Sequence, residues 1–253
     1  MTDGADAAAF TEDRLLGGRL RLLQPREGYR IAIDPVFLAA AVPAGPQDMV
    51  LDIGCGAGAA MLCLAARAPG CRLIGLEMRR ELVRLAGDNV ILNGMTSRAS
   101  VMMGDLLRPP PRLAPGSFDH VMANPPYYER GRVTPPASAE KAAAEIEGEA
   151  DLAAWVRFAL SMVRAEGTLT FVYRADRFDA LVKEIAGRAG GIVLFPLWPM
   201  RGKPASRILV QARKGIAAPA RLASGLLLHE EDGRLTPLAE AILRDGDALS
   251  LAS

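Results

Sequence analysis

The chain of 253 residues has little of what metal centres, disulfide frameworks and membrane anchors require. It contains two histidines, and its three cysteines, Cys55, Cys63 and Cys71, follow no usual zinc-ligand spacing. No apolar run reaches the roughly 18 residues that a membrane-spanning helix needs. The composition therefore predicts no metal site and no membrane span, with the cysteines as small core residues in a reducing compartment.

Targeting signals and excess charge are also scarce. Residues 1–14 are acidic and lack the positive and then apolar pattern of a signal peptide, so we expect a cytoplasmic protein. The formal net charge is +1, which by itself does not indicate a polyanionic partner. The segments 17–30 and 201–214 are locally basic, and either a solvated surface or a nucleic-acid contact would explain them.

From residue 48 onward, short apolar segments alternate with segments of helical length. This alternation predicts an α/β fold in which helices cover both faces of a mostly parallel sheet. No helix separates the last two strands, which predicts an antiparallel hairpin at one edge. The seven expected strands are 49–54, 71–77, 99–105, 118–126, 168–174, 192–198 and 206–215. The expected helices are 59–68, 79–94, 151–167 (capped by Asp151 and ended by Gly167) and 175–190.

Two extensions flank this core, which we place at residues 46–215. Residues 1–45 are expected to form a hairpin around 15–24 and a helix beginning at Asp34, both packed on the core. Residues 216–253 are expected to add a strand at 221–233 and a capped helix at 236–246 to the same domain. The Ala-, Pro- and Glu-rich segment 131–150 is interpreted as a mobile loop.

The sequence "LDIGCGAG" places Asp52, Gly54, Gly56 and Gly58 where the first core strand meets the first helix. Glycines at such a junction let the backbone approach a nucleotide-like ligand. A nicotinamide cofactor is the main alternative, but the Asp52 carboxylate would repel its pyrophosphate. A carboxylate there suits a ligand with a cationic amino group and no phosphate. The D-x-G-x-G-x-G spacing is that of S-adenosylmethionine (SAM) methyltransferases.

Two further acids follow the next two strands. Glu77 lies 25 residues after Asp52, where its carboxylate can accept hydrogen bonds from both ribose hydroxyls. Asp105, in "MMGDLL", can accept a hydrogen bond from the adenine amino group. Each acid alone could simply cap a turn, but together with the glycine loop they favour an adenosine-containing ligand.

The sequence "NPPYY" begins at Asn124, where the fourth core strand ends. Pro125 and Pro126 cannot donate backbone hydrogen bonds, and they stiffen the segment. The Asn124 side-chain oxygen and the Pro125 carbonyl could accept from a planar amino group, while Tyr127 offers a face for stacking a base. We therefore predict that Asn124, Pro125, Pro126 and Tyr127 form the catalytic segment of an amino-group methylation site.

These motifs resemble those of class I SAM-dependent amino-methyltransferases with a Rossmann-like fold. Within them the chain is similar to the bacterial tRNA(Val) adenine-N6 methyltransferases, through "GYRIAIDPVFLAAAV", the doubled tyrosine and "GKPASRILVQARKG". The resemblance implies SAM as the cofactor, S-adenosylhomocysteine as the product, and a tRNA anticodon loop as the substrate. The implied cofactor residues are Asp34, Asp52, Gly54, Cys55, Gly56, Gly58, Glu77, Met78, Asp105, Leu106 and Asn124. The implied substrate residues are Tyr127, Tyr128, Arg30, Lys203 and Arg207.

Other functions remain compatible with the same motifs. A glutamine carboxamide of a translation release factor, or guanine N2 of ribosomal RNA, would require the same chemistry. The chain could also be an RNA-binding module on an inactive methyltransferase scaffold, although the retained Asp52, Glu77 and Asn124 argue against this. A nicotinamide-dependent reductase is the least favoured alternative.

Overall fold

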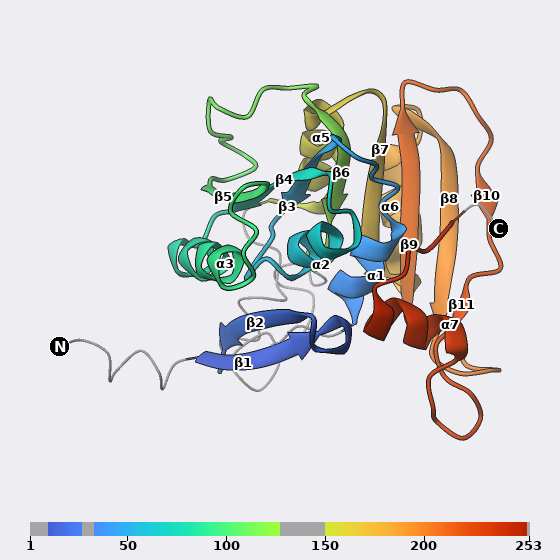
Figure 1. The fold of residues 1–253 in the computed structure, drawn as a ribbon. Coiled ribbons are helices and arrows are strands. Elements are labelled where there is room, and N and C mark those ends of the chain that lie inside the picture. Colours follow the sequence, from blue (N-terminus) through green and yellow to red (C-terminus); the bar gives the residue numbers. More distant parts are fainter. Residues whose placement is uncertain (1–9, 27–32, 127–149, 252–253) are drawn as a thin grey trace.

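A computed structural model describes residues 10–26, 33–126 and 150–251, and its central feature is one nine-stranded sheet (Figure 1). The strand order is β10-β8-β9-β7-β6-β3-β4-β5, and β11 also pairs with β8. Five strands that run parallel to one another form the larger part of this sheet. They are β3 (Met49–Ile53), β4 (Arg72–Glu77), β5 (Ala99–Met103), β6 (Phe118–Ala123) and β7 (Val163–Arg174).

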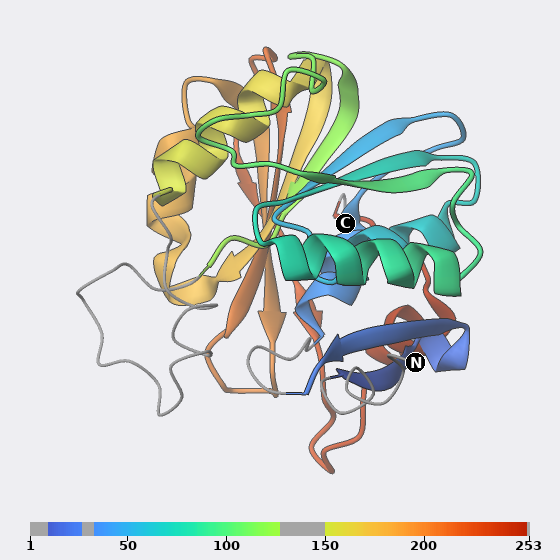
Figure 2. The same cartoon turned by 90° about the vertical axis from the view of Figure 1, so that its left-hand side faces the viewer.

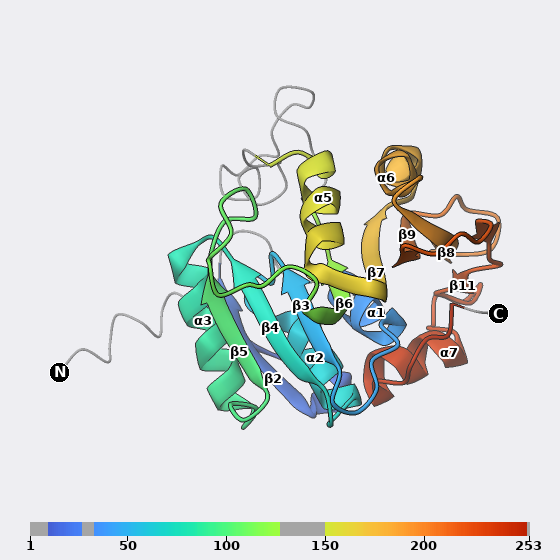
Figure 3. The same ribbon diagram turned by 90° about the horizontal axis from the view of Figure 1, so that it is seen from above.

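Helices cover both faces of the sheet, and each face has its own apolar cluster (Figure 3). One cluster includes residues of α1 (Asp34–Ala41), α2 (Ala59–Arg67) and α3 (Arg80–Leu92). The other includes residues of α5 (Leu152–Met162) and α6 (Phe178–Ile185). The strands between them are almost continuously apolar, as expected for a parallel sheet that is buried on both faces. None of the helices in the described residues is both long and apolar enough to cross a membrane.

The predicted antiparallel hairpin is confirmed, but its strands do not lie in sequence order. β8 (Ala189–Trp198) and β9 (Arg207–Lys214) pair with each other, and β9 also pairs with β7, so that β9 lies between them. The sheet has nine strands and not seven, because β10 (Arg221–Leu222) and β11 (Leu226–Leu227) pair with β8. These two short strands replace the single strand predicted at 221–233.

The helix predicted to end at Gly167 ends five residues earlier, at Met162. Its predicted cap is correct, because the Asp151 carboxylate accepts a hydrogen bond from the Ala154 backbone N–H at 2.7 Å. Gly167 instead lies inside β7, where a Cβ atom would come within 2.6 Å of the Asp119 carbonyl oxygen. The close approach of β6 therefore explains this glycine, and helix termination does not.

The predicted N-terminal hairpin is formed by β1 (Phe10–Leu15) and β2 (Leu20–Pro25), and it lies beneath α3 in Figure 2. The fully buried Asn89 side chain joins it to the core: its Oδ1 accepts from the Leu23 N–H at 2.7 Å, and its Nδ2 donates to the Ala57 carbonyl at 2.9 Å. The Thr236-capped helix α7 (Pro237–Glu240) lies near the other end of the chain.

Candidate cofactor and substrate site

The carboxyl ends of the parallel strands bring Gly54, Glu77 and Asn124 to one edge of the sheet, which we call the carboxyl edge. β3 lies between β4 and β6, with Ile53 opposite both Leu76 and Ala123. Gly54, Glu77 and Asn124 each follow one of these three residues directly. The register of the sheet therefore places the glycine loop between the Glu77 and Asn124 strand ends.

The glycine loop turns sharply from β3 into α2. Two of its N–H groups donate to the Leu76 carbonyl, Gly54 at 2.8 Å and Cys55 at 3.1 Å. Gly56 has φ +57°, and an added Cβ there would have no described atom within 4 Å. Gly58 caps α2 with φ +90°. The open space at Gly56 lies on the loop where we predicted the cofactor.

Asp52 is the most unusual ionisable group at this edge. Its side chain is buried, and Oδ2 has no hydrogen-bond partner among the described residues. The pKa of Asp52 is raised to about 8, chiefly by burial; the hydrogen bond from the Met61 backbone N–H partly offsets this rise, and the negative charge of Glu77 adds to it. A buried carboxylate oxygen without a partner would be stabilised by a cationic amino group, such as that of SAM.

Glu77 is also buried, but its carboxylate has partners. Oε2 accepts from the Gly56 backbone N–H at 3.0 Å, and Oε1 accepts from the Arg79 backbone N–H at 2.9 Å. The carboxylate thus joins the end of β4 to the glycine loop. Each oxygen has a second lone pair, so ribose hydroxyls could be bound by the same group.

We expect Glu77→Ala to weaken SAM binding, because a charged acceptor of ribose hydroxyls is lost. Hydrogen bonds to charged groups contribute about 1.5–3 kcal/mol each, so affinity should fall at least about tenfold, as measured by titration calorimetry. Glu81→Ala removes an exposed acid from the first turn of α3 and serves as the control. Unchanged affinity in Glu77→Ala would exclude Glu77 as the ribose acceptor.

Residues predicted for the adenine end surround the ends of β4 and β5. Met78 is 61% exposed directly after Glu77, and Leu106 is partly buried. The Asp105 carboxylate accepts from the Leu107 backbone N–H at 2.9 Å, so one of its oxygens is already engaged in a local turn. Cys55 is buried beneath the loop, where burial raises its thiol pKa well above the ordinary value.

The Asn-Pro-Pro segment leaves β6 beside the glycine loop. Asn124 is partly buried, Pro125 is buried and Pro126 is partly buried. Tyr127, Tyr128 and Arg30 lie outside the described residues, as does most of the predicted loop at 131–150. Their assignment to substrate binding therefore stays a prediction.

One ion pair joins a predicted cofactor residue to a predicted substrate residue. Arg207 Nε donates to Asp34 Oδ2 at 2.9 Å, and the Asp34 side chain is only 4% exposed. The pair connects α1 to the start of β9, although the two residues are 173 positions apart. Lys203 lies in the β8–β9 turn and is exposed.

The basic segment 201–214 is divided by the fold. Lys203 and Arg207 lie at the carboxyl edge, whereas Arg213 and Lys214 lie at the opposite end of β9. There Arg213 donates to the Glu166 carbonyl at 3.1 Å, and Lys214 donates to the Val163 carbonyl at 2.8 Å. Only the first part of this segment can therefore face a substrate bound at the carboxyl edge.

Trp155 lies beside the glycine loop, although the sequence analysis did not predict it as part of the site. It lies in the first turn of α5, is 9% exposed, and places its ring against Gly54. The apolar pattern of α5 predicts that Trp155 is buried, but it does not specify the glycine loop as its neighbour.

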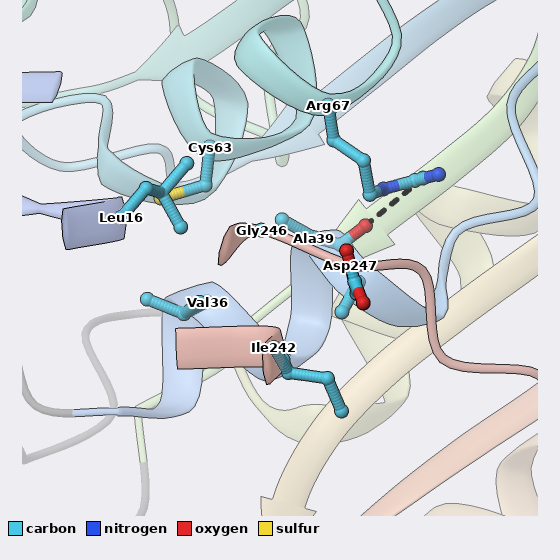
Figure 4. Close-up of a pocket in the computed structure, with 9 residues that line it drawn as sticks. Leu16, Val36, Ala39, Cys63, Arg67, Ile242, Gly246 and Asp247 are labelled. Carbon is cyan, nitrogen blue, oxygen red and sulfur yellow. Dashed lines mark hydrogen bonds between the residues drawn. The ribbon is translucent and has the colours of Figure 1, made fainter. Parts of the chain in front are cut away.

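A small pocket lies away from these residues, between α1, α2 and the turn at Gly246–Asp247 (Figure 4). Arg67 lies at one side of it and donates to the carbonyls of Ala39, at 3.2 Å, and Val42. These bonds join α2 to α1, which indicates a structural role. The described residues contain no cluster of His, Cys, Asp and Glu that could hold a metal ion.

Comparison with known proteins adds a domain match and distant relatives. Residues 32–146 match the methyltransferase small domain. The tRNA1(Val) (adenine(37)-N6)-methyltransferase of Dickeya chrysanthemi is 27% identical over 87% of this chain and 88% of that protein. The protein of the same name from Tolumonas auensis is 28% identical over 85% and 88%. The release factor glutamine methyltransferase of Caulobacter vibrioides is 30% identical, but over 45% of this chain and 37% of that protein.

Solved structures share the fold. A predicted O-methyltransferase from Agrobacterium tumefaciens superposes with a TM-score of 0.71 and 24% identity, covering 86% of this chain and 98% of that one. A SAM-dependent O-methyltransferase from Thermotoga maritima gives a TM-score of 0.55 with 16% identity, covering 76% and 68%. The predicted Rossmann-like class I architecture is thereby confirmed.

The domain match spans the glycine loop, the strand-end acids and the Asn-Pro-Pro segment together. The buried, unpartnered Asp52 oxygen and the open space at Gly56 suit the cofactor of such a domain. The chain is therefore a SAM-dependent methyltransferase.

Proposed function

We propose that this methyltransferase modifies the N6 amino group of adenine in a tRNA anticodon loop, at the purine directly 3′ of the anticodon. The observation that carries this proposal is the placement of Asn124 and Pro125 at the end of β6, beside the glycine loop on β3. The cofactor supplies an electrophilic methyl group there when it is bound.

The chemistry must overcome the poor nucleophilicity of an aromatic amino group, whose lone pair is delocalised into the ring. The Asn124 side-chain oxygen and the Pro125 carbonyl are proposed to accept the two N–H bonds of this group. Both hydrogen bonds strengthen as the lone pair localises on nitrogen, and they also fix the direction of approach. Because Pro125 and Pro126 have no backbone N–H, neither can satisfy these acceptors locally.

An RNA loop is favoured as the substrate by the distant relatives and by the position of the basic residues. The tRNA1(Val) methyltransferases resemble this chain over more than four-fifths of its length. Lys203 and Arg207 lie at the same sheet edge as Asn124, where positive charge can contact phosphates. A base in an anticodon loop is unpaired, so its extrusion into a site costs little.

The principal alternative is a glutamine carboxamide of a translation release factor. Its amide nitrogen has the same delocalised lone pair, and the Caulobacter release factor glutamine methyltransferase is 30% identical to this chain over 113 residues. That similarity covers less than half of either protein, whereas the similarity to the Dickeya tRNA enzyme covers 87% of this chain and 88% of that protein. The N2 amino group of guanine in ribosomal RNA could donate to the same two acceptors. An RNA-binding module without activity would have no use for them.

We expect transfer of labelled methyl groups from SAM to tRNA(Val) that lacks the modification, with nucleoside analysis giving N6-methyladenosine. The same tRNA with guanosine in place of the target adenosine is the control, and it should accept no label. A release factor and unmodified ribosomal RNA should be tested in parallel. Label in either of these and none in tRNA would refute the proposed substrate, while no transfer to any acceptor would favour the RNA-binding module.

A further inference from the structure

Two glycines of the glycine loop differ in the space that their surroundings leave for a side chain. An ideal Cβ on Gly54 would lie 2.4 Å from Cη2 and 3.1 Å from Cζ3 of Trp155. An ideal Cβ on Gly56 would have no described atom within 4 Å. Both residues have positive φ, +66° and +57°, so backbone strain on substitution is similar at the two positions. Protein packing therefore excludes a side chain at Gly54, whereas the space beside Gly56 is open.

The indole ring is held firmly in this position. Trp155 is 9% exposed and belongs to the same apolar cluster as its α5 neighbours Leu152, Val156 and Phe158. The cap at Asp151 fixes the helix turn that carries it. Moving the ring away from Gly54 would open a void in a packed cluster, which costs free energy.

Backbone hydrogen bonds connect Gly54 to the rest of the glycine loop. Its N–H donates to the Leu76 carbonyl at 2.8 Å, and the neighbouring Cys55 N–H shares that acceptor. One residue further, the Gly56 N–H donates to the Glu77 carboxylate at 3.0 Å. A shift of Gly54 would therefore disturb both the loop backbone and the carboxylate predicted to bind ribose.

We propose that Trp155 is a positioning residue for SAM: through the contact of its ring with Gly54, it fixes the position of the glycine loop. Substitution of Trp155 should then change the affinity for SAM as well as the stability of the core. The proposal rests on the SAM-dependent activity and is independent of which substrate is methylated.

The first test separates affinity from stability with two substitutions in α5. Trp155→Leu should lower the melting temperature and raise the SAM dissociation constant by about tenfold, which corresponds to about 1.4 kcal/mol. Phe158→Leu is the matched control, because Phe158 is 6% exposed in the same cluster and helix. It should lower the melting temperature and leave SAM affinity unchanged. A Trp155→Leu protein that is destabilised but binds SAM like the wild type would overturn the proposal.

The second test is a double-mutant cycle in the ligand-free protein. Gly54→Ala should be strongly destabilising, and adding Trp155→Leu should recover part of that loss by making room for the new methyl group. The same cycle with Gly56→Ala should be additive, since Gly56 has no described neighbour in that direction. Additivity in both cycles would show that the ring does not restrain Gly54, and would refute the proposed contact.

A spectroscopic measurement avoids the loss of folding that a large substitution could cause. The chain has two tryptophans, so Trp198→Phe leaves Trp155 as the sole indole fluorophore. Addition of SAM should change the emission of this variant, and should not change that of Trp155→Phe, in which only Trp198 emits. Emission of Trp155 that is insensitive to saturating SAM would contradict the proposal even if every Trp155→Leu variant failed to fold.

Discussion

Asn124→Ala is expected to lower turnover by about a hundredfold or more while SAM still binds with near-normal affinity. The lost acceptor engages the amino group most strongly in the transition state, so its removal affects the rate more than ground-state binding. Asn124 leaves the sheet on β6, whereas the glycine loop follows β3 and Glu77 ends β4, so the predicted cofactor contacts of the loop and of Glu77 stay in place. Single-turnover rates at saturating SAM and RNA, together with SAM titrations, measure the two quantities separately.

Asn124→Asp is the informative control for this experiment. It retains an acceptor oxygen at the same position and should keep more activity than the alanine variant. If Asn124→Ala turned over at a near-normal rate, or if its loss were explained entirely by weaker SAM binding, the proposed amino-methylation mechanism would be wrong.

Asp52→Asn is expected to stabilise the ligand-free protein and to weaken SAM binding. Burial raises the pKa of Asp52 from 3.8 to about 8, so between these values the folded protein holds a proton that the unfolded chain has lost. The Asp52 contribution to the free energy of unfolding therefore falls as the pH rises from about 4 to 8, and it levels off above 8. The asparagine variant does not lose stability in this way. Its free energy of unfolding relative to the wild type should therefore rise across the same pH range, with an upper bound on the order of 5 kcal/mol.

Melting temperatures of the wild-type and Asp52→Asn proteins, measured at about pH 5, 6, 7 and 8, test the predicted effect on stability. Asp88→Asn, which removes a half-exposed carboxylate from α3, is the control and should not reproduce the trend. An Asp52→Asn protein that is less stable than the wild type at pH 8 would show that the carboxylate is not a buried, uncompensated charge.

The cofactor part of this prediction follows from the same buried carboxylate. A cationic amino group close to Asp52 favours the ionised form, so SAM binding below about pH 8 should release a proton. Calorimetry in buffers of different ionisation enthalpy detects that proton, and the asparagine variant should release fewer and bind more weakly. Equal affinity and equal proton release in the two proteins would exclude Asp52 as the partner of the cofactor amino group.

The sequence by itself was sufficient for the elements whose signals are local. Glycine at 54, 56 and 58 after an apolar strand predicted the tight β3–α2 turn, because positive φ is accessible to glycine at little cost. The alternation of strands and helices predicted the parallel sheet, and parallel strands necessarily carry their end residues to one edge. The sequence alone therefore predicts that the acids at 52 and 77 and the amide at 124 lie at the same edge.

The tertiary structure decided what depends on partners distant in the chain. Periodicity shows that a residue is buried but not which surface buries it, so neither the contact of Trp155 with Gly54 nor the pairing of Asp34 with Arg207 could be predicted. The helix predicted through Gly167 ended at Met162 because neighbouring β6 favours an extended chain there, and pairing between strands overrode local helical propensity. The pKa of Asp52 likewise depends on complete burial by the surrounding fold, since desolvation by distant residues, and not the local sequence, penalises its charge.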